Sequence, residues 1–392
     1  MPKRILILGG GTGGVVSALF LSEQVRGFGF DAEITLVNKD EWHYMPPLWM
    51  DVALEGIPLD ETRAPIRNLE KYGVRVVVDE AVKIDPANRR VSLAGGDSLE
   101  YDYLIVALGS RNGWEAYPGL AEAGYHNYDP EGAVEFNKAL REFPGGRVVI
   151  LVPEMPYRCG TYPMEFATVL GYRLATRGIN PDITLVVPMA PNGATPVEGL
   201  GPDIAKLWLK YFEKYNVKVI PHKGFERVDP GRNVVVTKNN EIPYDLLVKV
   251  PPLRLPKVLE DPEFVYPDDN RFTKSRAPDF RHPDYDDIFM IGEHAMEPTG
   301  LSTAGVFIHV AAHRASSEIL YELGGSYPPE KVPPVACVAY SGDKGFLGVC
   351  EIEYDTSQGK YTWRKCYNAL ESGMIKLVKR AFYQGWLNRL RF

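Results

Sequence analysis

Apolar residues along the chain gather in short runs, and the first run leads directly into glycines. Residues 5–8 read Ile-Leu-Ile-Leu, residues 9–14 read Gly-Gly-Gly-Thr-Gly-Gly, and a stretch with helical character follows at 15–25. A short apolar run bounded by turn residues is typical of a strand buried in a parallel sheet. The pattern therefore predicts a strand, a tight turn and a helix.

Later apolar runs are also bounded by turn residues, and helical stretches separate several of them. The predicted strands, some with their terminal turns, are 32–37, 101–110, 148–152, 183–187, 217–220 and 287–293, and the predicted helices include 164–177 and 204–215. Strands that alternate with helices indicate βαβ units. The sequence thus predicts an α/β protein with two Rossmann-like domains, one split and one inserted, and a C-terminal segment.

The glycines of the first turn are spaced for phosphate binding. Gly9, Gly11 and Gly14 match G-x-G-x-x-G, with Thr12 and Gly13 between them. In this motif the first glycine permits the tight turn, the second admits a pyrophosphate, and the third allows close helix–strand packing. The N-terminus of the helix directs free N–H groups at the phosphates. We therefore expect a dinucleotide site here.

Three strand ends favour FAD over NAD as the dinucleotide. The second strand ends at Asn38-Lys39, where an acidic residue usually binds the ribose, and Asn can form that hydrogen bond without charge assistance. Segment 101–110 ends in a small-residue turn, and segment 287–293 ends in Gly292-Glu293. This order resembles FAD-dependent reductases with two dinucleotide domains, in which the last acid binds the ribityl chain.

The predicted FAD contacts lie in the first and third parts of the chain. We expect the FAD domain to comprise 1–110 and 241–325, the second Rossmann-like domain 111–240, and a C-terminal quinone and membrane segment 326–392. Gly300 is expected to let its loop pass close to the flavin. The predicted contacts are Gly9, Gly11, Thr12, Gly13, Gly14, Asn38, Lys39, Ala81, Val82, Ala107, Gly109, Gly292, Glu293 and Gly300.

Composition narrows the class of protein. The chain has 392 residues, 45% of them hydrophobic, and a net charge of −7, which argues against nucleic acid as a partner. No run approaches the ~20 apolar residues that span a bilayer. No signal peptide is expected, because the first core strand starts at Ile5. The four cysteines are too scattered for a disulfide framework or a zinc site, and no metal is expected.

The second half lacks a second glycine loop. After the strand at 148–152 the chain reads Pro-Glu-Met-Pro-Tyr-Arg-Cys-Gly, so two prolines remove backbone donors and no glycine occurs before Gly160. A Rossmann-like domain without this loop has no expected site for nicotinamide. The absence argues against an enzyme driven by NAD(P)H.

Two cysteine segments carry the most specific resemblance. Residues 156–159, Pro-Tyr-Arg-Cys, followed by 163–165, Pro-Met-Glu, resemble the segment with one redox cysteine in sulfide:quinone oxidoreductases. Residues 335–339, Val-Ala-Cys-Val-Ala, resemble the segment with the family's second redox cysteine, which a short hairpin follows. The resemblance extends from the glycine motif to the C-terminal tail.

The resemblance implies a disulfide that receives sulfide sulfur and passes two electrons to FAD. Cys337 is then the cysteine proximal to the flavin, and Cys159 accepts the sulfur. Only a thiolate can attack the flavin or a disulfide. The alternative is that each cysteine is a buried small apolar residue. Glu165 is implied in proton handling, although a carboxylate is also common in a first helical turn.

One position departs from the family pattern. Many members carry a third cysteine where this chain has Tyr128, so covalent attachment of FAD through that residue is excluded and long polysulfide growth is doubtful. Cys350 and Cys366 match no redox position and are expected to be structural. His43 and His294 have no metal-binding spacing, and each is interpreted as a core or solvated histidine.

The tail combines apolar and basic residues at helical spacing. Apolar pairs at 374–375, 377–378, 381–382 and 386–387 are interleaved with Lys376, Lys379, Arg380, Arg389 and Arg391. Such a helix can lie in a membrane interface, which would place the protein on the membrane surface as a peripheral, monotopic protein. A helix packed on the protein itself or at a contact in a homo-oligomer is the alternative. Phe346, Phe382 and Tyr383 are the candidates for binding a quinone.

These features predict an enzyme that oxidises sulfide to sulfane sulfur or polysulfide and passes two electrons through non-covalent FAD to quinone. One alternative is a type II NADH:quinone oxidoreductase, and another is the flavoprotein subunit of a flavocytochrome-type sulfide dehydrogenase. A third is a non-catalytic flavin-binding adaptor. The missing second glycine loop separates the first alternative from our interpretation.

Overall fold

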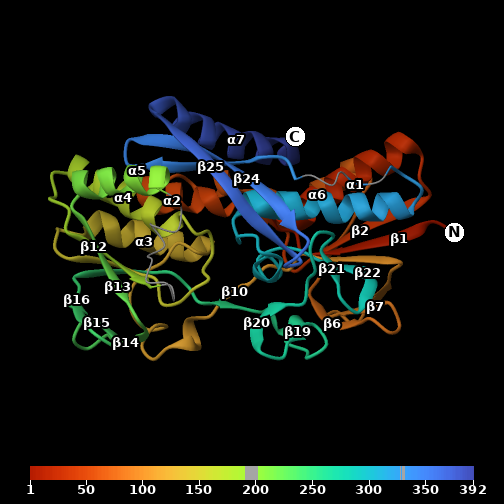
Figure 1. Ribbon diagram of the computed structural model, residues 1–392, viewed down its shortest axis with the longest axis horizontal. Helices are drawn as coiled ribbons and strands as arrows, with labels where there is room; N and C mark the ends of the chain where they lie inside the picture. The colour runs from red at the N-terminus through yellow and green to blue at the C-terminus, as the bar shows by residue number, and fades with distance from the viewer. Residues whose placement is uncertain (190–201, 327, 329–331) are drawn as a thin grey trace.

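The computed structural model describes residues 1–189, 202–326, 328 and 332–392, without the side chains of residues 202, 203 and 364–369. It contains two parallel sheets side by side, with a C-terminal antiparallel sheet and helix across both (Figure 1). The predicted α/β architecture with two Rossmann-like halves is confirmed. Among the described residues, no helix combines the length and apolar character needed to cross a membrane.

The first sheet combines strands from both ends of the chain. Its order is β21-β22-β9-β1-β2-β5, and all neighbours except β21 and β22 are parallel. The strands are β1 (Lys3–Leu8), β2 (Ala32–Asn38), β5 (Arg75–Val78), β9 (Tyr103–Val106), β21 (Arg281–His282) and β22 (Tyr285–Met290). The N-terminal third of the chain therefore depends on strands from about residue 285 to complete its sheet.

Alternation along β1 gives the first sheet two buried faces. Ile5 and Ile7 pack under helices α1 (Thr12–Phe28) and α6 (Gly305–Glu322), whereas Leu6 and Leu8 join the opposite core cluster. The small antiparallel sheet of β6 (Ala81–Asp85), β7 (Arg90–Leu93) and β8 (Ser98–Glu100) contributes to that cluster. A strand buried on both faces explains the continuous apolar run in the sequence.

The second sheet is parallel and has the order β13-β12-β11-β17. Its strands are β11 (Val148–Leu151), β12 (Ile183–Pro188), β13 (Val217–His222) and β17 (Leu246–Lys249). Helices α3 (Pro130–Glu142), α4 (Tyr162–Thr176) and α5 (Pro202–Lys214) share its core, and the other face carries β14 (Phe225–Asp229), β15 (Val234–Thr237) and β16 (Glu241–Pro243). Because β17 pairs with β11, this sheet extends past the expected boundary at residue 240.

The C-terminal segment forms a three-stranded antiparallel sheet and a long helix. They are β23 (Val335–Ser341), β24 (Lys344–Asp355), β25 (Lys360–Ser372) and α7 (Gly373–Arg391). Figure 1 shows α7, in dark blue, along the top of the molecule. Short elements fill the connections: α2 (Trp49–Glu55), β3 (Trp42–Tyr44) with β4 (Arg63–Pro65), β10 (Arg111–Asn112) with β18 (Leu253–Arg254), and β19 (Val265–Tyr266) with β20 (Asp269–Thr273).

Candidate functional site

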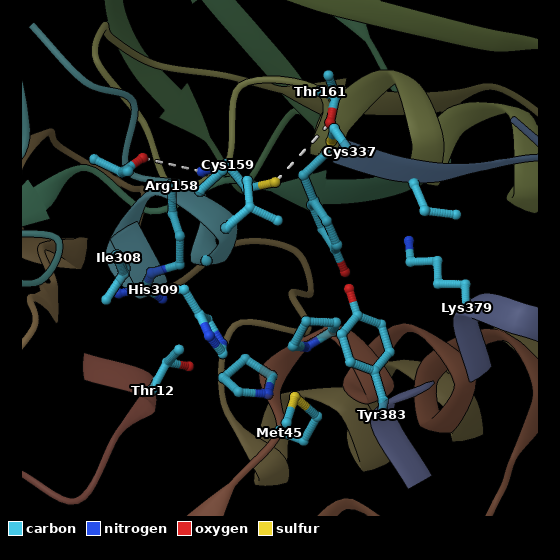
Figure 2. Close-up of a pocket in the computed structure, with 18 of the residues that line it drawn as sticks. Thr12, Met45, Arg158, Cys159, Thr161, Ile308, His309, Cys337, Lys379 and Tyr383 are labelled. Carbon is cyan, nitrogen blue, oxygen red and sulfur yellow. Dashed lines mark hydrogen bonds between the residues drawn. The ribbon is translucent and has the colours of Figure 1, made fainter. Parts of the chain in front are cut away.

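A cavity of about 430 Å³ lies where the two sheets and the C-terminal segment meet. Its walls come from the glycine loop at Thr12, the segment before α2, the loop between β11 and α4, the start of α6, strand β23 and helix α7. Figure 2 shows Cys159 and Cys337 at one end and Thr12 and Met45 at the other, with Lys379 and Tyr383 along one side. The cavity thus connects the dinucleotide loop to the two cysteine segments.

The glycine loop has the geometry that a dinucleotide requires. Gly9 has a φ of +103°, and a Cβ there would collide with the carbonyl of Ala107. A Cβ on Gly14 would collide with the carbonyl of Gly9, so this glycine permits the close approach of α1 to β1. A Cβ on Gly11 would meet nothing within 4 Å, which leaves that side of the loop open. The loop fits a pyrophosphate on the open side.

The structure corrects the expected role of Asn38. Its Oδ1 accepts a hydrogen bond from the N–H of Gly10 at 2.8 Å, and its Nδ2 donates to the carbonyls of Asp40 at 2.8 Å and Trp42 at 3.2 Å. Both amide hydrogens are used within the protein and the residue is buried. Asn38 therefore holds the glycine loop in place and does not present a donor to a ribose.

Two strand ends that were expected to contact the flavin converge beside the loop. Gly109 and Gly292 both have positive φ, and a Cβ on Gly292 would lie 3.7 Å from the nitrogen of Gly109. Glu293 lines the cavity, and its carboxylate forms an ion pair with Arg158 at 2.7 Å and accepts a hydrogen bond from Ser110. This ion pair joins the end of β22 to the residue before Cys159.

Of the fourteen predicted flavin contacts, Thr12 and Glu293 line the cavity, and the other twelve are absent from its described lining. Among these twelve, Lys39 is exposed at the end of β2, and Ala81 and Val82 belong to β6. Gly300 has a φ of +84°, and a Cβ there would collide with the carbonyl of Tyr361 on β25. The close approach of β25 explains this glycine, and its contact with the flavin stays a prediction.

The loop between β11 and α4 holds Cys159 in an unusual backbone conformation. Cys159 has a φ of +58°, in the left-handed region that non-glycine residues rarely adopt. Its N–H donates to Oγ1 of Thr303 at 3.2 Å, and the same hydroxyl donates to the carbonyl of Tyr157 at 3.0 Å. Thr303 lies just before α6, the helix that packs on the first sheet. The cysteine loop is therefore fixed by a segment that belongs to the first sheet's half of the molecule. Such strain is concentrated at functional sites.

The structure brings the two remote cysteines to the same wall of the cavity. Cys159 and Cys337 are both free thiols, and each lines the cavity. Burial, together with the nearby Cys337 and Glu165, raises the pKa of Cys159 to about 12, whereas Lys379 and a hydrogen bond with Thr161 oppose the rise. Burial also raises the pKa of Cys337, again against the influence of Lys379 and Thr161. Lys379 is therefore the cation that favours a thiolate here.

Glu165 and Lys379 form a buried ion pair beside the cysteines. Glu165, in the first turn of α4, accepts a hydrogen bond from Nζ of Lys379 and another from the N–H of Tyr340 at 2.7 Å. Burial lowers the pKa of Lys379, but Glu165, Tyr383 and Tyr340 together outweigh it and the net shift is upward. The sequence pattern grouped Lys379 with the basic residues of an exposed helix face, and that interpretation is wrong because the side chain points into the protein.

The predicted quinone contacts separate into two groups. Phe382 and Tyr383, both on α7, line the cavity. Phe346 does not: it is buried in the second core, where its ring lies edge-on to Trp208 with 4.9 Å between ring centroids. The expectation that Phe346 contacts quinone is therefore wrong, since the strand β24 directs this side chain toward α5.

The remaining predictions concern cysteines and histidines. Cys350 is disulfide-bonded, which agrees with a structural role, and the side chain of Cys366 lies outside the described residues. His43 and His294 are both buried, as expected for core histidines. Among the described residues no cluster of His, Cys, Asp or Glu could hold a metal ion.

Sequence reasoning missed several residues of the site. Arg158 was part of a quoted motif without a role, yet it joins the cysteine loop to Glu293. Trp386 lines the cavity from α7, and its neighbours in the sequence gave only a helical apolar period. Tyr128 also lines the cavity, buried and with no hydrogen-bond partner for its hydroxyl among the described residues. Only knowledge of the packing distinguishes these residues from ordinary core positions.

Comparison with known proteins identifies the family. The sequence profile of the family described as pyridine nucleotide-disulphide oxidoreductase matches residues 3–250. The sulfide-quinone reductase of Aquifex aeolicus is 26% identical over 370 residues, which are 88% of this chain and 83% of that protein. The mitochondrial sulfide:quinone oxidoreductase of Mus musculus is 25% identical over 77% of this chain and 68% of its own length.

A solved structure supports the same assignment for the fold. The X-ray structure of the sulfide:quinone oxidoreductase from Aquifex aeolicus superimposes with a TM-score of 0.83 at 22% identity, covering 99% of this chain and 91% of that one. The resemblance inferred from the cysteine segments is thereby confirmed, and the family implies a flavin cofactor. This chain is an oxidoreductase that belongs to the pyridine nucleotide-disulphide oxidoreductase family and is similar within it to the sulfide:quinone oxidoreductases.

Proposed function

We propose that this protein is a peripheral membrane flavoenzyme that oxidises sulfide and reduces quinone. The observation that carries the proposal is the meeting of Cys159 and Cys337 in a cavity that begins at the glycine loop. These residues come from different elements, and no local pattern requires two free thiols to share a cavity. The names of the relatives from Aquifex aeolicus and Mus musculus support the same reaction.

The residues present fit FAD. The open side of the glycine loop at Gly11 suits the pyrophosphate, and the turns at Gly109 and Gly292 border the same site. When bound, the flavin accepts two electrons from sulfur and delivers them to quinone. Tyr128 stands where the resemblance implies a cysteine, so no thioether bond to the flavin can form there, which supports non-covalent binding.

The sulfur chemistry begins from the oxidised enzyme, in which the two thiols of this structure have lost two protons and two electrons and formed a disulfide. Hydrosulfide then attacks the sulfur of Cys159, the bond to Cys337 breaks, and the products are a persulfide on Cys159 and a thiolate on Cys337. When the thiolate bonds to the outer persulfide sulfur, one proton and two electrons are released and a trisulfide forms. In both oxidations a bound FAD would take up the two electrons, and quinone would receive them with two protons. Lys379 lies where a cation favours the thiolate.

Helix α7 is the element that supports the proposed attachment to a membrane. Its exposed apolar residues are Met374, Leu377, Val378 and Phe382, with exposed fractions of 72%, 70%, 56% and 61%. Phe382 also lines the cavity, so one helix carries both an apolar outer surface and part of the site. This arrangement suits an electron acceptor that enters from lipid.

An anaerobic titration tests the proposal. Sulfide is expected to bleach the flavin absorption of the purified protein, and addition of a quinone is expected to restore it. NADH is the control reductant. It is not expected to bleach the flavin, because the loop after β11 offers no second glycine turn for nicotinamide. Bleaching by NADH and not by sulfide would instead identify an NADH:quinone oxidoreductase.

Cysteine variants test the sulfur route. Cys159→Ser and Cys337→Ser are each expected to abolish sulfide-dependent quinone reduction while the flavin content stays at the wild-type level. Retained flavin separates loss of chemistry from loss of fold. Full activity of Cys337→Ser would exclude the proposed route of the electrons and favour a flavin-binding protein with another role.

A further inference from the structure

His43 connects the C-terminal helix to the glycine loop. It lies on β3, fully buried, with its Nδ1 2.8 Å from the carbonyl oxygen of Gly10 and its Nε2 3.0 Å from Nε1 of Trp386. A carbonyl only accepts hydrogen bonds and an indole N–H only donates them. His43 is therefore neutral, with its hydrogen on Nδ1, and both ring nitrogens are occupied.

The bond from His43 sets the direction of one peptide group in the glycine loop. The N–H of Gly10 is held by Asn38 and its carbonyl by His43, so two buried side chains fix this residue from both sides. In a planar trans peptide the carbonyl and the next N–H point in opposite directions. With the carbonyl of Gly10 directed at His43, the N–H of Gly11 is directed away from it. Donors in this loop are the groups that bind a pyrophosphate.

Trp386 is well placed to influence this contact from α7. It lines the cavity, and its ring lies 5.5 Å from that of His309 on α6. The last turn of α7 is anchored to the first half of the chain, because Asn68 donates to the carbonyl of Leu390 and Tyr72 to that of Arg389, both at 2.8 Å. The indole of Trp386 is therefore held beside the ring of His43.

We propose that Trp386 is a positioning residue for the flavin, acting through His43 on the peptide of Gly10, so that the docked helix α7 strengthens the hold of the glycine loop on FAD. This inference rests on the flavin site of the proposed function. It assigns to the C-terminal helix a role in cofactor retention, in addition to its part in the cavity wall and its exposed apolar surface.

His43 keeps the same protonation state, and therefore the same hydrogen bonds, across the physiological pH range. Burial lowers its pKa to about 4, the bond to Gly10 opposes that shift, and His309 adds to it. The ring thus stays neutral at physiological pH, and its acceptor nitrogen remains available to the indole.

The test compares the release of FAD from two tryptophan variants. Trp386→Phe keeps an aromatic ring and removes the donor, and Trp363→Phe is the matched control, because Trp363 on β25 is 48% exposed and lies outside the described cavity lining. Release is followed by the recovery of free FAD fluorescence after dilution, without sulfide or quinone. We expect about tenfold faster release from Trp386→Phe, the change that corresponds to one lost hydrogen bond, and less than about twofold from the control.

A double-mutant cycle that combines Trp386→Phe with His43→Gln tests whether Trp386 acts on the glycine loop through His43. If Trp386 acts through His43, the effects of the two substitutions on FAD release are non-additive. A purely structural role would instead lower the unfolding midpoint of the apoprotein without changing FAD release. If His43→Gln fails to fold, the comparison of the two tryptophan variants decides alone.

Three results would overturn the inference in different ways. Unchanged FAD release from Trp386→Phe, with sulfide bleaching intact, removes the relay and leaves the proposed function. Additive effects in the cycle remove the role of His43. A wild-type protein that retains no FAD removes both the relay and the flavin part of the proposed function.

Discussion

Lys379 is a buried cation that acts on four neighbouring groups. It neutralises Glu165, and it opposes the burial that raises the pKa of Cys159 and of Cys337. Its Nζ also lies 4.1 Å from the ring centroid of Tyr340. A carboxylate and a cation buried together are stable only as a pair, since removing one leaves the other charge without compensation. The consequences for reactivity and for stability can therefore be tested with suitable variants.

Lys379→Met is expected to move the sulfide reaction to higher pH. Loss of the cation raises the pKa of both thiols, so a given fraction of thiolate is reached only at higher pH, with a tenfold change in rate for about one pH unit. The measurement is the pH dependence of flavin bleaching by sulfide. Lys376→Met on the same helix is the control, because Lys376 pairs with Glu55 on α2.

The double variant Lys379→Met/Glu165→Gln tests the charge balance of this pair. Without the orphaned carboxylate its unfolding midpoint should recover toward that of the wild type, and its pH profile should also return toward the wild type, because Glu165 raises the pKa of both thiols. A pH profile of Lys379→Met that coincides with the wild type would contradict the role of this cation in thiolate formation.

Asp51 gives a prediction for stability. It is buried in α2, and burial, with Glu55 nearby, raises its pKa to about 6, against the opposing charges of Arg380, Lys379 and Lys376. The ordinary value is 3.8, so the folded state holds the proton between pH 3.8 and about 6 while the unfolded state loses it. Stability from this group therefore falls as the pH rises through that window.

Asp51→Asn is expected to raise the free energy of unfolding above pH 6. One pH unit corresponds to about 1.4 kcal/mol, which gives a gain of up to about 3 kcal/mol at pH 8. The gain should shrink as the pH falls toward about 3, where the wild-type side chain is largely protonated in both states. Urea unfolding at pH 8 and pH 5 measures it, and an equal gain at both values would contradict the explanation.

At the scale of elements, helix α7 has two distinct sides. One side carries Lys379, Leu387 and Leu390, which are buried, and the other carries Leu377 and Val378, which are exposed. A row of exposed apolar residues on one helix requires an explanation. The membrane attachment that we propose would provide it, because the exposed side would enter the acyl boundary while the buried side closes the cavity.

Leu377→Asp is expected to weaken binding to lipid vesicles by at least about tenfold, since burial of one leucine contributes about 2 kcal/mol. Co-sedimentation with anionic vesicles measures the binding. Val134→Asp, at another exposed apolar residue on α3, is the control and should bind as the wild type does. Reduction of a water-soluble quinone should persist in both variants. Wild-type vesicle binding by Leu377→Asp would contradict the membrane role of α7.

The elements of this protein were more predictable from sequence than the contacts between them. The strand and turn around Gly9 are local, so an apolar run and glycine spacing sufficed to place them. Phe346 was misinterpreted because strand alternation decides its side, and the alternation has no meaning until the neighbouring α5 is known. Lys379 was missed for the same reason: helical spacing groups residues on one side but does not say which side faces the core.

At the scale of the whole molecule, the first sheet depends on distant parts of the chain. Strand β22 pairs with β9 and comes from residues 285–290, and α6 packs beside α1. The region 3–250 that matches the family profile therefore lacks one side of its own sheet. Without β22, the fully buried strand β9 would become an edge with unpaired backbone groups.

In a fragment of residues 1–250 the first sheet is accordingly expected not to fold, while the second sheet, whose four parallel strands all lie within the fragment, stays folded. A fragment of residues 115–250, which contains only the second sheet, is the control. Chemical denaturation followed by far-UV circular dichroism should show the same single transition, with the same amplitude per molecule, in both fragments, and a larger change in the full chain. An additional cooperative change in the 1–250 fragment, absent from the control, would show that the first sheet tolerates the loss of its partner strands.

The anchoring of α7 decides how the protein can be handled in the laboratory. Phe392 is 93% exposed, so a purification tag joined after it leaves the helix undisturbed. Shortening the chain by a few residues has a different outcome, because Leu390 is fully packed and Arg391 donates to the carbonyls of Asp60 and Arg63. Expression vectors for this protein should therefore extend the carboxyl end and never trim it.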